Sequence, residues 1–231
     1  MGCKIGMVAG FINLHLRWDS LDFHAYLIYN ISMKVGDIMK AIANYVDESG
    51  LLLTKEALRS GIAKDSFYRF VTDNHFERVA QGVYLSPEAW EDSAFVLHQR
   101  CPRAVFSHDE ALFYYELIDR EPMEQTITIY SGYNTQKLKA SGIKVFTVKK
   151  ELLNVGRIEY KNSFGHMVPI YDMERTICDL VRSRSSFEIQ DFQTAIKSYI
   201  RRPDRDLNRL MSYAPLFRVE KLIRQYMEVL L

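Results

Sequence analysis

Apolar residues recur at helical spacing in the segment that follows Met33. The apolar face expected there is formed by Val35, Ile38, Ile42, Tyr45 and Val46. Gly50 ends this helix, and the apolar run 51–53 has the length of a short strand. Two further helices are predicted, over 55–60 with Thr54 as the N-cap and from 64 to about 74. The pattern therefore predicts three helices, with one short strand between the first and the second.

The segment after the third helix has the pattern of a β-hairpin. Short strands are predicted over 76–79 and 83–85, and Gly82 supplies the positive φ of the tight turn between them. Pro87 ends the unit because proline cannot continue a β-ladder. Three helices followed by a hairpin predict a winged helix-turn-helix over residues 33–87, in which the third helix enters the major groove of DNA.

Side chains on the polar side of the third helix and on the hairpin are the expected DNA contacts. They are Lys64, Ser66, Tyr68, Arg69, Arg78 and Gln81. Charge supports this assignment less well than the order of elements does, because residues 34–90 hold seven basic and eight acidic side chains. Phosphate neutralisation then predicts a modest, salt-dependent affinity. The alternative that such a domain docks a protein stays open.

Residues 88–231 are predicted to form a second domain, in which strands precede helices. Helices are expected over 91–99 and 107–117, the second with Ser107 as its N-cap. The strands that follow are expected over 125–130, 143–148, 157–160 and 167–170, and the last helices over 172–182, 188–199, 204–213 and 216–230. We therefore predict an α+β fold, with an N-terminal winged helix-turn-helix followed by a mixed α/β C-terminal domain ending in a helical segment.

Composition narrows the class of protein. The 231 residues are 48% hydrophobic, which is enough for a core, and the formal net charge of +1 excludes binding to nucleic acid or membrane through overall charge alone. Three widely spaced cysteines predict neither a disulfide framework nor a zinc finger, and favour the cytoplasm. Within residues 1–32, the apolar stretch is too short to span a membrane, and no signal-peptide cleavage site follows it. We interpret them as an N-terminal extension that precedes the functional protein.

Several motifs, taken in order, resemble those of the AbiEi antitoxins of the AbiE (type IV) abortive-infection toxin–antitoxin systems of bacteria. The motifs lie at 52–58, 61–62, 67–69, 77–84, 106–112 and 171–180, and the resemblance spans Met33 to the C-terminus. It implies an antitoxin that represses its own operon by binding double-stranded DNA at inverted repeats in the promoter. Its functional partner would be a nucleotidyltransferase-type toxin, countered without a stable protein complex. Residues 1–32 have no place in the family pattern.

Candidate chemistry is sparse. Glu159-Tyr160-Lys161 has the E-x-K spacing of metal-dependent nucleases, which makes a nuclease the alternative function. Such a site needs a second carboxylate upstream, and Glu151 in a predicted turn is the one acid between Glu124 and Glu159. His98, Cys101 and His108 lack a fourth ligand at a matching spacing. We therefore predict that the protein is not an enzyme and holds no metal or cofactor, and we expect no membrane association.

Two charged segments allow both a structural and a functional interpretation. Asp172 is expected to cap a helix, on which Arg175 and Asp179 are four residues apart and are expected to pair on the exposed face. Between 182 and 224 there are ten basic and five acidic residues. The possible basic patch consists of Arg201, Arg202, Arg205 and Arg209. Either these residues are salt-paired in solvent, or they bind phosphate, including an RNA shared with the toxin.

Overall fold

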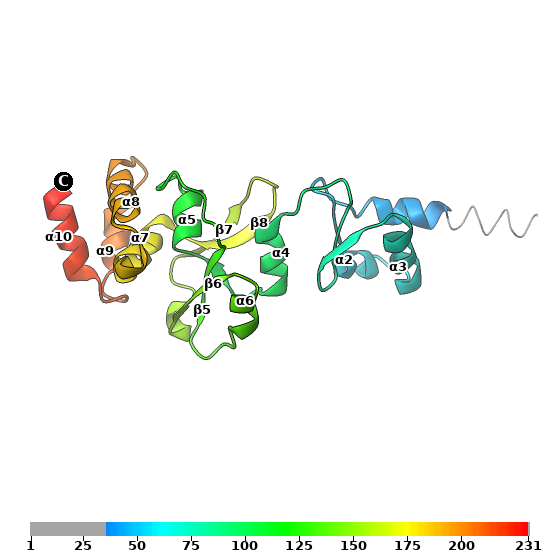
Figure 1. The fold of residues 1–231 in the computed structure, drawn as a ribbon, viewed down its shortest axis with the longest axis horizontal. Coiled ribbons are helices and arrows are strands. Elements are labelled where there is room, and N and C mark those ends of the chain that lie inside the picture. The colour runs from blue at the N-terminus through cyan, green and yellow to red at the C-terminus, as the bar shows by residue number, and fades with distance from the viewer. Residues whose placement is uncertain (1–35, 231) are drawn as a thin grey trace, which may run out of the picture.

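The fold is mixed α/β with two sheets, in a computed structural model that describes residues 36–230 (Figure 1). The molecule is elongated: an N-terminal unit, a central sheet and a group of C-terminal helices follow one another along its long axis (Figure 1). The expectation for residues 1–32 lies outside the described residues. Within the described range, none of the helices is long and apolar enough to cross a membrane.

Most elements of the N-terminal unit occur close to where the apolar pattern predicts them. The first helix is the exception: it ends at residue 43 instead of continuing to Gly50, and Val46 forms a β-bridge with Leu52. Residues 36–43 are helical, and the elements that follow are β1 (Leu51–Leu53), α2 (Thr54–Arg59), α3 (Lys64–Asp73), β2 (Glu77–Ala80) and β3 (Val83–Leu85). The three strands form an antiparallel sheet in the order β1-β3-β2. Its core contains Ile42, Leu52, Ala57, Phe67 and Tyr84. Burial of these side chains is what holds such short elements together, because isolated helices of this length are marginal in water.

Thr54 does not cap α2, contrary to the prediction. Leu53 takes the N-cap position with an extended backbone, and no side chain caps the helix. The Thr54 hydroxyl is buried without a partner, while its backbone N–H donates to the Gly82 carbonyl oxygen at 2.9 Å. Because β1 runs directly into α2, the turn of the hairpin supplies the acceptor for the first N–H of the helix.

Gly50 and Gly61 of this unit both have positive φ but lie in different surroundings. A Cβ at Gly50 would lie 2.4 Å from the Cβ of Ala89, whereas a Cβ at Gly61 would meet nothing within 4 Å. We expect Gly61→Ala to lower the free energy of unfolding by about 1 to 2 kcal/mol through backbone strain alone. Gly50→Ala should cost at least about 1 kcal/mol more, because overpacking adds to the same strain. Urea denaturation measures the free energy of unfolding of both variants. An equal decrease in the two variants would contradict the close packing at Gly50.

The second sheet has five strands and mixed directions. They are β4 (Val105–Phe106), β5 (Thr126–Tyr130), β6 (Lys144–Val148), β7 (Arg157–Lys161) and β8 (Met167–Tyr171), in the order β6-β5-β4-β8-β7. The pairs β5–β6 and β4–β8 are parallel, and the pairs β4–β5 and β7–β8 are antiparallel. The central strand β4 was not predicted because two residues are too few to show a period. The helix α6 (Gln136–Ala140), between β5 and β6, was also not predicted, because its five residues are too few to show a helical period.

The helix α4 (Ser93–Arg100) packs against both sheets. Val96 lies in a cluster with Leu51, Val83 and Leu85 of the N-terminal unit. Ala94 and Leu97 lie in another cluster, with Phe106 and Ile170 of the five-stranded sheet. The helix begins two residues later than predicted because Asp92 is its N-cap, accepting a hydrogen bond from the Phe95 N–H at 2.9 Å.

Ser107 is not the N-cap of α5 (Asp109–Tyr114), which is shorter than predicted. His108 precedes the helix with φ 52°, and no side chain caps it. The Ser107 hydroxyl lies 2.8 Å from that of Thr128 on the neighbouring strand β5, which makes it a contact within the sheet. The Ser107–Glu110 spacing therefore does not form a capping box.

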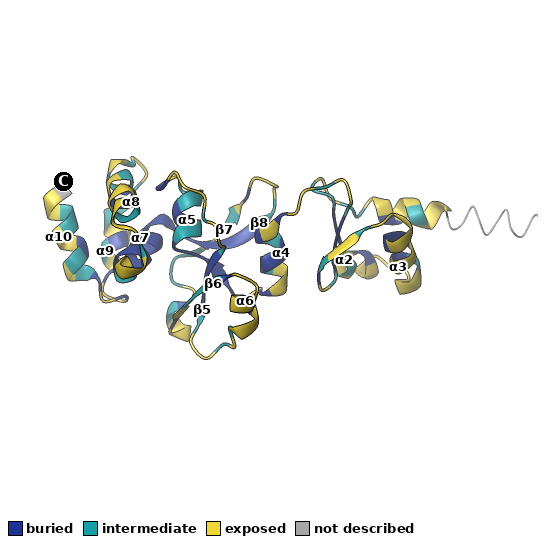
Figure 2. Ribbon diagram, in the orientation of Figure 1, coloured by how far each residue is buried: buried dark blue, intermediate teal, exposed yellow. Residues whose placement is uncertain are grey.

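The C-terminal helices are α7 (Met173–Arg182), α8 (Ile189–Arg201), α9 (Leu207–Tyr213) and α10 (Glu220–Leu230). Asp172 caps α7, as predicted, by accepting from the Arg175 N–H. The helix α9 starts three residues late because Asp206 caps it, and α10 starts after a turn in which Arg218 has φ 60°. All residues of α7 from 173 to 181 are buried, and Figure 2 shows this contrast with the more exposed outer helices.

Candidate nucleic-acid interface

The helix α3 separates its apolar and polar side chains as predicted. Phe67, Phe70 and Val71 are buried in the core of the N-terminal unit. The other side carries Lys64, Tyr68 and Arg69, all exposed, and the half-buried Ser66. Because Phe67 and Phe70 anchor the helix from behind, its polar side is presented to solvent on a rigid base.

Tyr68 connects this polar side to the hairpin. Its ring is 39% exposed and packs edge-on against Phe67 and Tyr84, with centroid distances of 5.4 and 6.3 Å. The Lys64 Nζ lies 5.9 Å from the centre of the same ring. Tyr84 belongs to β3 and stands opposite Arg78 in the strand register. These aromatic contacts hold α3 and the hairpin in a fixed relation, so that side chains of both can face one ligand.

The hairpin presents two of the expected contacts at its outer end. Arg78 is exposed on β2, just before an irregularity in the register between Arg78 and Ala80. Its Nε donates to the Ala80 carbonyl oxygen at 3.4 Å, a long hydrogen bond. Gln81 is exposed in the turn, and Gly82 has the predicted positive φ of 75°.

Charges on this surface are largely unpaired. Within the described part of the chain, Lys64, Arg69 and Gln81 make no side-chain hydrogen bond or ion pair. Asp65 and Asp73 are exposed on the same helix, so the surface is not uniformly basic. Such a surface favours binding through a few directed contacts over binding through a strong positive field.

The four arginines of the possible basic patch are mostly engaged within the protein. Arg202 forms a two-pronged pair with Asp204, at 2.8 and 2.9 Å, and Arg205 donates to the Arg202 carbonyl oxygen at 2.7 Å. Arg209 lies 3.6 Å from Asp206 and 3.8 Å from Glu174. Arg201 is exposed, with no partner among the described side chains. The geometry favours the salt-paired interpretation for Arg202 and Arg209, whereas Arg205 is held by a backbone carbonyl oxygen.

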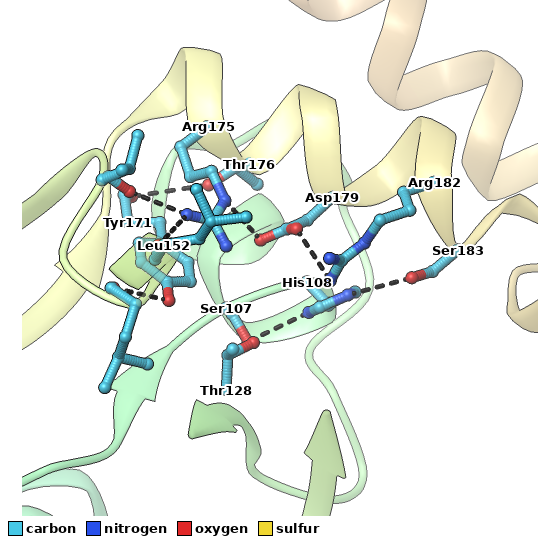
Figure 3. Close-up of polar contacts among 12 residues, drawn as sticks. Ser107, His108, Thr128, Leu152, Tyr171, Arg175, Thr176, Asp179, Arg182 and Ser183 are labelled. Atoms are coloured by element: carbon cyan, nitrogen blue, oxygen red, sulfur yellow. Dashed lines mark hydrogen bonds and ion pairs between the residues drawn. The ribbon is translucent and has the colours of Figure 1, made fainter. Parts of the chain in front are cut away.

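Arg175 and Asp179 pair as predicted by their spacing, but both are fully buried, which corrects the expectation of an exposed pair. The Arg175 Nε donates to Asp179 at 3.1 Å, and Nη1 donates to the carbonyl oxygens of Leu152 and Val155 at 3.0 and 2.8 Å (Figure 3). The guanidinium lies between the rings of Tyr171 and Phe217, at 4.0 and 3.8 Å from their centres. Burial raises the pKa of Asp179, against the effect of the guanidinium groups of Arg175 and Arg182. These contacts account for Arg175 as a structural residue.

The His108 side chain is a second buried polar group, and its burial was not predicted from the sequence. The ring of His108 is fully buried and stacks on Phe146 at 3.5 Å, with its nitrogens 3.0 Å from the Ser107 hydroxyl and 3.2 Å from that of Ser183 (Figure 3). Burial, together with the nearby charges of Arg182, Lys144 and Arg175, holds the pKa of His108 well below its usual range. The neutral imidazole therefore links β4 to the end of α7. The run Ser107-His108-Asp109-Glu110 was the available signal, but it does not reveal burial.

The residues of the nuclease alternative do not converge. The Glu159 carboxylate pairs with Arg157 at 3.2 Å and is half exposed, and Glu151 lies in a separate 3₁₀ turn (Lys150–Leu152). Across residues 36–230, no three His, Cys, Asp or Glu side chains are grouped so that they could hold a metal ion. Cys101 is buried beside the Tyr133 hydroxyl, away from any metal-ligand set. The arrangement gives no support to the nuclease hypothesis.

Comparison with known proteins shows similarity in fold. No family model matches the chain, and no curated protein matches it. Among solved structures, the RV2827C protein from Mycobacterium tuberculosis is similar, with a TM-score of 0.53 and 14% sequence identity. The match covers 80% of this chain and 70% of that one. At this identity, the likeness concerns the fold alone.

Proposed function

We propose that the N-terminal unit is a winged helix-turn-helix that binds double-stranded DNA, and that the chain is an autorepressor and antitoxin of a type IV toxin–antitoxin system. The observation that carries the DNA-binding proposal is the exposed polar side of α3, which stands beside the hairpin. Its Lys64 and Arg69 side chains make no hydrogen bond or ion pair among the described residues. The order of helices and hairpin supports it.

The proposed mode of binding follows from the position of each side chain. The helix α3 lies in the major groove, where Arg69 and Lys64 donate to base edges or phosphates and Ser66 and Tyr68 add shorter contacts. Arg78 and Gln81 on the hairpin reach the adjacent backbone or minor groove. Inverted repeats in the promoter would be occupied by two copies of the unit, one on each half-site.

The antitoxin part of the proposal rests on the resemblance of the motifs to the AbiEi family. A nucleotidyltransferase-type toxin is the proposed functional partner in the cytoplasm, countered without a stable complex. Co-expression tests this part: the intact chain should restore growth to cells that express the toxin encoded beside it. If growth stays arrested although the chain is present in soluble form, this part of the proposal fails.

Removing one charge from α3 should weaken operator binding and leave the fold unchanged. Arg69→Ala or Lys64→Ala should each lower affinity by about 5- to 100-fold, because a base or phosphate contact is worth about 1 to 3 kcal/mol. Gel shifts with the chain's own upstream DNA at moderate salt measure the effect. Lys139→Ala removes an equal charge from the exposed surface of α6 and should leave binding unaltered. Equal shifts with all three variants would count against the proposed interface.

A further inference from the structure

One histidine side chain connects the N-terminal unit to the central sheet. His166 lies in the turn between β7 and β8, and its two ring nitrogens contact carboxylates from two other parts of the chain. Nε2 is 3.0 Å from Asp47 Oδ2, in the turn before β1, and Nδ1 is 2.7 Å from Asp92 Oδ2, at the start of α4. These contacts span 119 and 74 residues of sequence.

Both contacts can form together only if the ring is charged. A neutral imidazole has one N–H donor and one acceptor nitrogen, whereas an ionised carboxylate can only accept. An imidazolium donates from both nitrogens, so each carboxylate receives a charge-assisted hydrogen bond. The ring is also held in place by stacking on Phe95 of α4, at 4.0 Å and an angle of 16° between the planes.

Other hydrogen bonds stabilise the buried carboxylate of Asp92 that accepts from His166. It is 1% exposed, and its Oδ1 accepts the N–H of Phe95 as the N-cap of α4. Its Oδ2 accepts from the Asn162 amide at 2.7 Å as well as from His166. A buried carboxylate needs such partners because an unpaired charge there is costly. Asp47 is more open, and its Oδ1 accepts from the N–H groups of Ser49 and Leu51.

We propose that His166 is a pH-sensitive clasp, which holds the N-terminal unit against the central sheet when its ring is protonated and releases that unit when the proton is lost. The helix α4 packs on both sheets through Val96 and Leu97, so the two units stay connected when the clasp opens. Opening therefore widens the range of angles between the units and unfolds neither of them.

The charged groups around the ring set the direction of the effect. Burial acts to lower the pKa of His166, but the hydrogen bonds and charges of Asp92 and Asp47 outweigh it and raise the pKa above the ordinary value of 6.5. For Asp47, burial acts to raise the pKa, and the hydrogen bonds from Ser49, His166 and Leu51 outweigh it, so the pKa is lowered. Phe95, which stacks on the ring, and Asn162, which donates to Asp92, are neutral.

The sign of the pH dependence follows from these two shifts. A histidine whose pKa is raised by folding contributes stability that is complete below its unfolded value and is lost as the pH rises through the raised value. An aspartate whose pKa is lowered contributes stability that is lost as the pH falls through the lowered value. The clasp is thus closed in mildly acid solution, and opens on the alkaline side as His166 deprotonates.

Titration by NMR tests the clasp in the full chain without any DNA. The Cε1–H signal of His166 should titrate above the ordinary pKa, and Asp47→Asn should lower that pKa by about one unit, as removal of an opposite charge does. Glu48→Gln removes the neighbouring carboxylate, which does not contact His166, and should leave the titration unchanged. A His166 pKa at or below the ordinary value in the unaltered protein would overturn the proposal.

A distance measurement tests the consequence for the two units. Spin labels at Asp73→Cys of α3 and Lys139→Cys of α6, with Cys3 replaced by serine, report one distance between exposed positions on the two units. The distribution should be narrow at a pH below the His166 pKa found by NMR, and broader at a pH well above that pKa, where the imidazole is neutral. Asp47→Asn should be broad at both, and Glu48→Gln should follow the unaltered protein. A distribution that is the same at both pH values, in all three proteins, would show that the clasp does not restrain the units.

Discussion

Replacing Arg175 by methionine is expected to lower the free energy of unfolding by about 3 to 5 kcal/mol, as loss of one partner from a buried ion pair does. Methionine keeps much of the length of the side chain but cannot donate, so Asp179 loses its buried partner and the carbonyl oxygens of Leu152 and Val155 lose their donor. The rings of Tyr171 and Phe217 also lose the guanidinium group that lies between them. Urea denaturation followed by circular dichroism measures the loss.

Two companion variants separate the buried pair from a general loss of charge. Arg182→Met removes the other cation that contacts Asp179, but the Arg182 side chain is 28% exposed and should cost about 1 kcal/mol. Combining Arg175→Met with Asp179→Leu should cost less than the sum of the two single changes, because no buried charge is then left unpaired. Equal losses for Arg175→Met and Arg182→Met would contradict the structural role given to Arg175.

The N-terminal unit was predictable because its elements are defined by local patterns. The buried face of α3, formed by Phe67, Phe70 and Val71, shows helical spacing within one stretch of sequence. Gly82 marks the turn of the hairpin in the same local way. The same spacing showed which side of α3 would meet solvent, so the exposure of Tyr68 and Arg69 followed from the pattern. Whether this surface binds DNA remains a prediction.

Burial of polar residues could not be read in the same way. The spacing of Arg175 and Asp179 showed that they could pair, but an exposed pair is the ordinary outcome of that spacing. Their burial depends on Phe217 and on the loop at Leu152 and Val155, which are distant in the sequence. His166 and its two carboxylates are separated even more widely, so no motif joins them.

Caps were partly predictable, and the two failures share a cause. Asp172 caps α7 as expected, and aspartate also caps α4 and α9. Thr54 and Ser107 do not cap, because the strand before each helix already fixes the chain. The Ser107 hydroxyl bonds across the sheet, and the Thr54 N–H bonds to the hairpin turn. The Ser107 hydroxyl thus serves the sheet, whereas the Thr54 hydroxyl has no partner and the backbone alone ties that residue to the hairpin.

Removing three basic side chains from the proposed interface should nearly abolish operator binding. The combined variant Lys64→Ala, Arg69→Ala and Arg78→Ala should lower affinity by about 100- to 10,000-fold if each contact contributes about 1 to 3 kcal/mol and the contacts are only partly additive. The salt dependence should also change: the slope of log affinity against log salt should fall by up to about three, since each phosphate contact contributes about 0.9. Fluorescence anisotropy with labelled operator DNA over about 50 to 200 mM salt measures both quantities.

A charge-matched variant separates this interface from a general effect of net charge. Lys137→Ala, Lys139→Ala and Lys149→Ala together remove three exposed cations from α6 and the end of β6, away from the N-terminal unit. If the polar side of α3 and the hairpin make the contacts, this control should bind operator with nearly the slope and affinity of the unaltered chain. Parallel losses in the two triple variants would mean that DNA is attracted by overall charge, and the assignment of α3 as the recognition helix would fail. Thermal unfolding of both variants checks that the comparison is made between folded proteins. Apart from Arg78, none of the six side chains makes a hydrogen bond or an ion pair within the described chain, so both variants should stay folded.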